Sequence, residues 1–151
     1  MTPAAMKRKV DPFFRRYAER FQHALDDPSE VDTDGVVGSF AEYFVASSPA
    51  GVRGGKNGLA FKFMIGRGFA HYRKIGTVSM KLSKLEVTRL DDIHAMAKVT
   101  WDSRYRRRKD GAKIRIVFAN LYFLVFRKGV PKIFAYVTGD EQALLKKHGL
   151  V

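Results

Sequence analysis

Two polar side chains stand where the sequence pattern predicts an apolar environment, and they are the first candidates for chemistry. Asn120 interrupts the apolar run IVFANLYFLVF, and Tyr17 lies in the helical stretch PFFRRYAERF. A buried amide without a hydrogen-bond partner costs about 1–3 kcal/mol, so Asn120 should be paired. We expect Asn120 to hydrogen-bond to a ligand or to Tyr17.

Asp102 is a third candidate, but strand alternation argues against it. It follows Trp101 in the sequence WDSRY, so the two side chains point to opposite faces of a strand. With Trp101 facing the core, Asp102 lies on the outer face, where Lys98, Arg104 or Arg115 can form an ion pair with it. A β-bulge would reverse this orientation, and Asp102 therefore stays an outside candidate for catalysis.

Histidine, cysteine and glycine-rich motifs give little evidence of a metal, catalytic or phosphate-binding site. The chain has no cysteine, and its four histidines have no carboxylate partner at a spacing that suggests a metal site. His71, beside Tyr72, is predicted to face solvent or cap a helix rather than act as a base. The stretch AGVRGGKNG lacks phosphate-loop spacing, because three residues rather than four separate Gly51 from Gly55. We expect no metal and no cofactor, and we interpret this stretch as a turn into a helix capped by Asn57.

The composition describes one folded domain with a strong positive charge. The chain has 151 residues, of which 46% are hydrophobic, and its net charge of +13 would attract polyanions or an anionic ligand. No apolar run approaches the roughly 18 residues of a membrane-spanning helix. The N-terminal sequence has no apolar segment typical of a secretory signal. We therefore expect a cytoplasmic protein with no membrane partner.

Helical spacing dominates the first half of the sequence. Residues 1–10 are predicted to form a flexible basic arm, and Asp11-Pro12 predicts the start of a helix that ends near Asp27. A short helix is expected from about Thr33 to Ala41, followed by a strand in EYFVASSP. A third helix carries apolar residues from Phe61 to Ile75 and ends at Gly76.

The second half alternates with a period of two, which is typical of strands. We predict a bulge near Ser83-Lys84, a turn at Asp91-Asp92, a hairpin turn at Asp110-Gly111 and another turn at Lys128-Gly129. Asp140 caps a last helix. The order predicts an α+β fold over residues 11–151, in which a strongly curved, mixed or antiparallel sheet wraps around the N-terminal helices and encloses a cone-shaped cavity.

Five stretches of the chain form a further pattern, and they are RRYAERFQHALDD, GSFAEYFVASSPAG, the WDSRY…DG hairpin, YFLVFRKGVPKIFAYVTGDE and LLKKHGL. Together they resemble the nuclear transport factor 2-like superfamily, which includes ketosteroid isomerases, scytalone dehydratases and polyketide cyclases. The resemblance implies a cystatin-like cone fold and isomerase, dehydratase or cyclase chemistry. Tyr17 matches the oxyanion-binding tyrosine of the isomerases, and Asn120 or Tyr122 lies nearest their second donor. Ser48 stands where they carry the catalytic aspartate, and serine cannot shuttle protons as a carboxylate does.

Three functions follow from these patterns. The first is a cavity that binds a small, largely apolar ligand, with or without proton-transfer activity; the second is a non-catalytic homodimeric module that uses the outer sheet face around Leu121, Phe123 and Val125. The third is nucleic-acid binding by the basic arm and hairpin, although the aromatic residues are predicted to face inward and so offer no stacking platform. The residues expected to contact a ligand are Tyr17, Phe21, Ser48, Val99, Trp101, Asn120, Tyr122, Phe134 and Tyr136.

Overall fold

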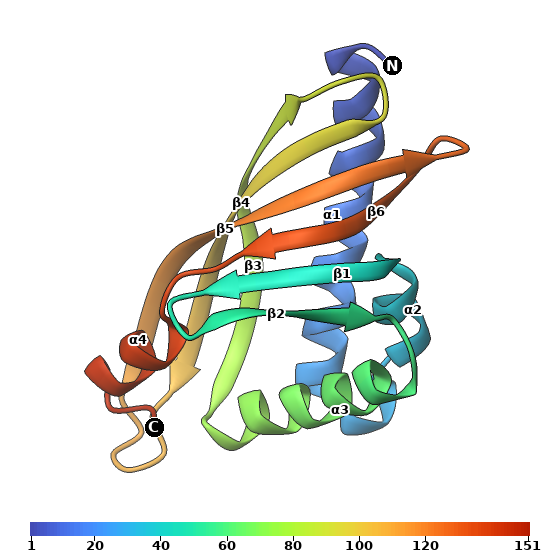
Figure 1. Ribbon diagram of the computed structural model, residues 1–151. Coiled ribbons are helices and arrows are strands. Elements are labelled where there is room, and N and C mark those ends of the chain that lie inside the picture. Colours follow the sequence, from blue (N-terminus) through green and yellow to red (C-terminus); the bar gives the residue numbers. More distant parts are fainter.

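A six-stranded mixed β-sheet forms the body of the protein in the computed structural model, which describes residues 1–151. The strands lie in the order β2-β1-β6-β5-β4-β3, and only β1 and β6 run parallel. Figure 1 shows the long strands curving across helix α1, which confirms the predicted α+β fold with a curved sheet around N-terminal helices. The strands are β1 (Phe40–Ser48), β2 (Gly51–Lys56), β3 (Thr77–Arg89), β4 (His94–Arg106), β5 (Lys113–Arg127) and β6 (Val130–Val137).

Four α-helices accompany the sheet. Helix α1 crosses its concave side, α2 and α3 lie at one end of that side, and α4 follows the last strand (Figure 1). A single 3-10 turn at Pro28–Glu30 links α1 to α2. The helices are α1 (Pro3–Asp26), α2 (Thr33–Gly38), α3 (Leu59–Lys74) and α4 (Glu141–Lys147).

Helix α1 begins at Pro3, so the prediction of a flexible arm over residues 1–10 was wrong. The N-cap is Thr2, whose Oγ1 accepts a 3.1 Å hydrogen bond from the Ala5 amide. Met6 and Val10 are completely buried. They extend the apolar stripe of the helix upstream, and burial of that stripe against the sheet orders the whole segment.

Asp11 is an interior residue of α1 instead of its N-cap. Its carboxylate pairs with Arg15 one turn later, at 2.6 Å from Nε. The basic residues Lys7, Arg8 and Lys9 are exposed on this rigid helix, so the positive charge of the segment is held in place.

The glycine-rich stretch forms strand β2, which corrects the predicted turn into a helix. Strand β2 pairs with β1 as an antiparallel hairpin. A Cβ atom on Gly54 would lie 2.7 Å from the Phe44 carbonyl oxygen, so close backbone approach explains this glycine. Asn57 does not cap α3 either: its amide donates to the carbonyl oxygens of Val37 and Phe40, and Gly58 occupies the N-cap position.

The remaining turns and caps follow the predictions. The ladder between β3 and β4 shifts register between Leu82 and Lys84, where the bulge was expected. Gly111 turns the hairpin between β4 and β5 with a φ of +70°. The Asp140 carboxylate caps α4 by accepting a 2.9 Å hydrogen bond from the Ala143 amide.

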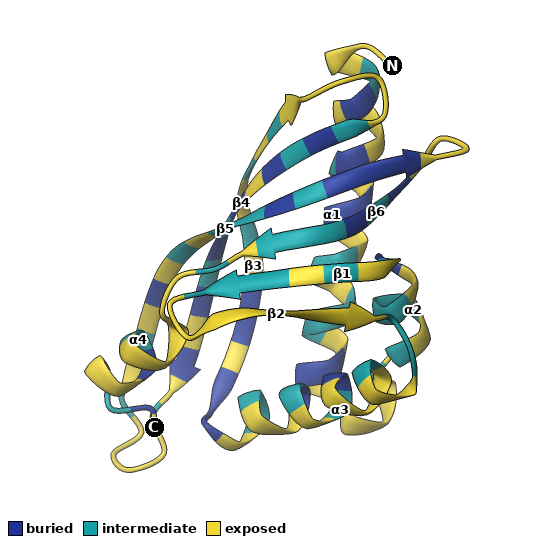
Figure 2. Cartoon of the chain, viewed as in Figure 1, coloured by how far each residue is buried: buried dark blue, intermediate teal, exposed yellow.

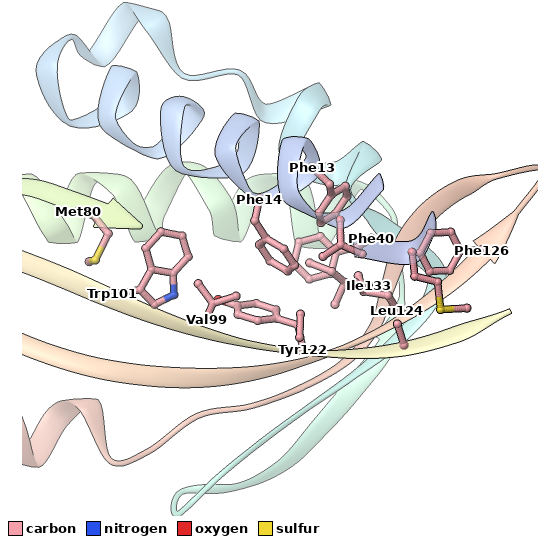
Figure 3. Close-up of a cluster of buried hydrophobic side chains, with 14 of the residues drawn as sticks. Phe13, Phe14, Phe40, Met80, Val99, Trp101, Tyr122, Leu124, Phe126 and Ile133 are labelled. Carbon is pink, nitrogen blue, oxygen red and sulfur yellow. The ribbon is translucent and has the colours of Figure 1, made fainter. Parts of the chain in front are cut away.

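The core lies between helix α1 and the concave face of the sheet. Figure 2 shows buried positions recurring along β4 and β5, whereas β2 is exposed along its whole length. In Figure 3, Phe14 from α1 approaches Tyr122 from β5, and their ring centroids are 4.9 Å apart. No helix is both long enough and apolar enough to cross a membrane.

Candidate functional site

A pocket of about 520 Å³ lies beside this core, between the sheet and the helices. Twenty of its 29 lining residues are hydrophobic, so an apolar molecule would fit its wall. Helix α1 contributes Tyr17 and Phe21 to the wall of the pocket, and helices α3 and α4 each form a further side of it. The β1–β2 hairpin adds Ser48 and Arg53. Arg53 and Glu141 are the two charged residues of the lining.

A cluster of phenols and one amide forms the main polar region of the wall. The side chain of Asn120 donates a 3.4 Å hydrogen bond to the Tyr122 hydroxyl. Tyr17 approaches from α1, with its ring centroid 6.2 Å from that of Tyr122 and 6.2 Å from that of Trp101. Tyr136 of β6 stacks on Tyr122 at 6.2 Å. The sequence separates these residues widely, and the packing of α1 on β4, β5 and β6 brings them together.

The phenols of this cluster are neutral near pH 7, and burial raises their pKa further. Burial raises the pKa of Tyr17 well above 10.0, and the neighbouring Tyr122 and Tyr136 add to the increase. Burial also raises the pKa of Tyr122, against the opposing effect of its hydrogen bonds with Asn120 and Trp101. The hydroxyl groups therefore stay neutral donors near pH 7, which suits them to a carbonyl or other acceptor oxygen.

A second polar region joins α3 to α4. The Tyr72 hydroxyl donates a 2.6 Å hydrogen bond to Glu141 Oε1, and both residues line the pocket. Burial, together with the charge of Glu141, raises the pKa of Tyr72 well above 10.0. Sequence reasoning missed this pair. Tyr72 lies on the apolar stripe of a predicted helix and Glu141 follows a predicted N-cap, but no sequence signal links the two helices.

Seven of the nine predicted contact residues line the pocket. Ser48 is among them, and its Oγ accepts a 3.2 Å hydrogen bond from the Ala50 amide at the β1–β2 turn. Val99 does not line the pocket, because it is completely buried in the core beneath α1. The seven are Tyr17, Phe21, Ser48, Trp101, Asn120, Tyr122 and Tyr136.

Phe134 lies on the outer face of the sheet, which corrects its predicted place in the cavity. The β5–β6 ladder shifts register so that Ile133 pairs with Leu124 and Ala135 with Phe123. One extra residue of β6 is accommodated there, and strict alternation fails across it. Phe134 consequently packs against His94 and Phe123, with ring centroids 5.6 and 6.3 Å away.

Asp102 also lies on the outer face, as strand alternation predicted. It accepts two hydrogen bonds of 3.1 Å from Arg115 and lies 3.6 Å from Arg104. The Arg115 guanidinium lowers the pKa of Asp102. This arrangement accounts for Asp102 as an ion-pair partner and excludes it from the pocket wall.

His71 is exposed on α3, with its ring centroid 6.1 Å from that of Tyr72. It does not line the pocket. No three histidine, aspartate or glutamate side chains are grouped in a way that could hold a metal ion.

Solved structures share this architecture at low sequence identity. The protein Aln2 from a Streptomyces species aligns with a TM-score of 0.66 and 17% identity, over 97% of this chain and 98% of its own. An NTF2-like protein with a cystatin-like fold from Novosphingobium aromaticivorans aligns with a TM-score of 0.66 and 14% identity, over 96% and 88% of the two chains. A ketosteroid isomerase-like protein from Erwinia carotovora atroseptica aligns with a TM-score of 0.59 and 12% identity, over 91% of this chain and 94% of its own. At these identities the likeness establishes the fold alone.

The sequence itself assigns the family. No curated protein matches it. Residues 8–141 match the family described as NTF2-like protein (DUF6841), which covers most of the chain from α1 to the start of α4. The cystatin-like architecture agrees with that match. The chain therefore belongs to the NTF2-like protein family DUF6841.

Proposed function

We propose that this NTF2-like domain binds a small, largely apolar molecule in the pocket and orients it by an acceptor oxygen. The observation that carries the proposal is the group of hydroxyls of Tyr17, Tyr122 and Tyr136, gathered beside the Asn120 amide in a largely apolar wall. Donors held in place inside a low-dielectric pocket bind an acceptor more strongly than the same groups do in water.

Isomerase chemistry of the ketosteroid type is not supported by the same wall. By the resemblance, Ser48 stands at the place of the isomerase aspartate, and its hydroxyl is not a proton acceptor near neutral pH. Asp102, the outside candidate, is engaged by arginines on the other face of the sheet. We therefore propose binding as the function of the phenol cluster, and any proton transfer in this pocket would have to use Glu141.

The test compares two probes that differ in one group, a carbonyl in place of a methylene. We expect 2-acetylnaphthalene to bind more tightly than 2-ethylnaphthalene in equilibrium dialysis, because only the ketone accepts hydrogen bonds from the cluster. Tyr17→Phe and Tyr122→Phe should each weaken ketone binding about five- to tenfold and leave hydrocarbon binding unchanged. Tyr43→Phe is the matched control, since Tyr43 is exposed on β1 and does not line the pocket.

Two results would contradict the proposal. Neither probe binding at millimolar concentration would show that the pocket does not accept an apolar ligand of this size. Unchanged ketone affinity in both phenylalanine variants would show that the phenols do not orient it.

A second candidate function is self-association through the outer sheet face. Val117 and Val137 are 51% and 41% exposed there, and Leu121 pairs with Val137 in the ladder beside the half-buried Phe123. Val117, Leu121 and Phe123 lie on one face of β5, and a row of apolar side chains of this kind suits a protein interface. Sedimentation velocity should then show a dimer for the wild type and a monomer for Leu121→Lys. Leu90→Lys, an equally drastic change at an exposed turn residue, should remain a dimer.

A further inference from the structure

Glu141 is the only carboxylate in the lining of the pocket, and no histidine accompanies it. It lies in the first turn of α4, a helix placed against the sheet by the buried Leu145 and Leu150. The segment after α4 is held as well, because Arg107 donates a 2.8 Å hydrogen bond to the His148 carbonyl oxygen. The carboxylate is therefore presented to the pocket by an anchored element.

Tyr72 restricts one oxygen atom of that carboxylate. Its hydroxyl donates to Oε1 at 2.6 Å, a distance typical of a hydrogen bond to a charged acceptor. The raised pKa of Tyr72 keeps it the donor of this pair. Oε2 accepts no hydrogen bond from the rest of the chain, and no lysine or arginine forms an ion pair with Glu141. Glu141 is exposed at the edge of the pocket, so one oriented carboxylate oxygen is left accessible to a ligand there.

A link between α3 and α4 alone would not explain this arrangement. Helix α4 is anchored independently of Tyr72, by Leu145 within it and by Leu150 and the Arg107 hydrogen bond after it. An acidic residue in the first helical turn does favour the helix dipole, but this effect does not require a pocket-facing position. The position of Glu141 in the lining and its orientation by Tyr72 point to recognition of a hydrogen-bond donor at the edge of the pocket.

We propose that the Tyr72–Glu141 pair binds a hydroxyl or amine group of the pocket ligand, through Glu141 Oε2. This inference rests on the proposed function and extends it. The ligand then combines an apolar body with an acceptor oxygen, bound by the phenol cluster, and a donor group directed to α4. Tyr72 acts as a positioning residue, because it orients the carboxylate and does not itself bind the donor group of the ligand. Glu141 accepts the hydrogen bond from that group.

The test uses 2-naphthol and 2-methoxynaphthalene, which share a ring system and an oxygen atom and differ in the methyl group that replaces the hydroxyl hydrogen, and binding is measured by equilibrium dialysis. Only the naphthol can donate a hydrogen bond, and the wild type should bind it about five- to tenfold more tightly. In Glu141→Gln the amide oxygen remains the acceptor for Tyr72 and the NH₂ group faces the ligand. The NH₂ group can donate to the oxygen of either probe but accepts nothing from the naphthol hydroxyl, so the preference for naphthol should disappear.

Two further variants separate recognition from a structural role. Tyr72→Phe should reduce the preference without abolishing it, because the carboxylate remains but is no longer oriented. Glu42→Gln removes an exposed carboxylate on β1 outside the pocket and should keep the full preference. Ether binding that is not weakened in any variant shows that the pocket is intact.

The possible failures are distinguishable. If neither probe binds to the wild type, the proposed function fails and this inference fails with it. The second failure is that the wild type binds the ether and the naphthol with equal affinity, or that Glu141→Gln keeps the preference for naphthol. In that case the pocket binds apolar molecules, and only the role of Tyr72 and Glu141 is overturned.

Discussion

The carbonyl oxygen of Arg106 lies where a side chain on Gly76 would have to begin. A Cβ atom on Gly76 would be 2.2 Å from that oxygen, and the glycine has a φ of +89°. The two residues also share a 2.8 Å hydrogen bond from the Arg106 amide to the Gly76 carbonyl oxygen. This contact sets the path of the chain from the end of α3 into β3, beside the end of β4.

Gly76→Ala should therefore be among the most destabilising small substitutions in the chain. It combines a left-handed backbone conformation with a clash against backbone atoms, and we expect a loss of about 2 kcal/mol or more in the free energy of unfolding. Gly66→Ala, in the middle of α3 with open space at its Cβ, should instead stabilise by about 0.5–1 kcal/mol. Urea denaturation of both variants measures this contrast, and equal stabilities would contradict it.

Met6 provides the test of the N-terminal segment. Because its side chain is completely buried in the core cluster, Met6→Ala should cost about 2–4 kcal/mol. Lys7→Ala, one position further along the same helix, should change stability by less than about 0.5 kcal/mol, since Lys7 is exposed. A Met6→Ala variant as stable as the wild type would indicate that residues before Asp11 do not pack as part of the domain.

The fold was predictable from local signals wherever a single segment carried them. The strands after Gly76 were predictable from the change of hydrophobic period at that residue and from turn residues such as Asp110-Gly111. Errors arose where a local signal competed with tertiary packing. Asp11-Pro12 has the composition of a helix start, but upstream burial extends α1 to Pro3; the glycines of β2 indicate a loop until close pairing with β1 is known.

Gly68 allows the pocket to be filled without strain. It lines the pocket on α3, and nothing lies within 4 Å of the position of an added Cβ. Gly68→Leu should raise helix stability, because glycine is a poor helix former, while its side chain occupies ligand volume. We expect at least a tenfold loss of 2-acetylnaphthalene affinity together with a melting temperature equal to or above that of the wild type.

Gly66→Leu is the matched control for that experiment. It makes the same change on the same helix, also with open space, at a position outside the pocket lining. Its gain in stability should be similar, and its ligand affinity should stay unchanged. A loss of affinity in both variants would place the binding site elsewhere on α3.

The candidate site was only partly predictable. Alternation placed Trp101, Asn120 and Tyr122 on the pocket side, because β4 and β5 are regular there. The same rule failed at Phe134, since a register shift in β6 leaves no mark in its sequence. Tyr72 and Glu141 could not be paired from the sequence, because they are 69 residues apart. Their contact depends on how the sheet places the two helices that carry them.

Asp110 at the hairpin tip gives the clearest dependence on pH. Arg107 binds its two carboxylate oxygens at 2.9 and 2.8 Å, and the Ala112 amide adds a third hydrogen bond. The guanidinium and then the amide lower the pKa of Asp110 from 3.8 to about 2. Since the pKa in the folded state is the lower one, the pair stabilises the protein above pH 3.8, and this contribution is lost as the pH falls towards 2.

Carboxyl NMR titration of Asp110 measures this directly. In Arg107→Gln the pKa should rise towards 3.8 without reaching it, because the Ala112 amide remains, and stability should vary less between about pH 4 and 2. Arg108→Gln is the control, as Arg108 binds the carbonyl oxygens of Arg73 and Lys74 instead of Asp110. Arg107 also holds the His148 carbonyl oxygen, so its loss should speed amide exchange after α4, whereas an Asp110→Asn change should not. A wild-type Asp110 that titrates near 3.8 would show that the guanidinium does not hold this turn.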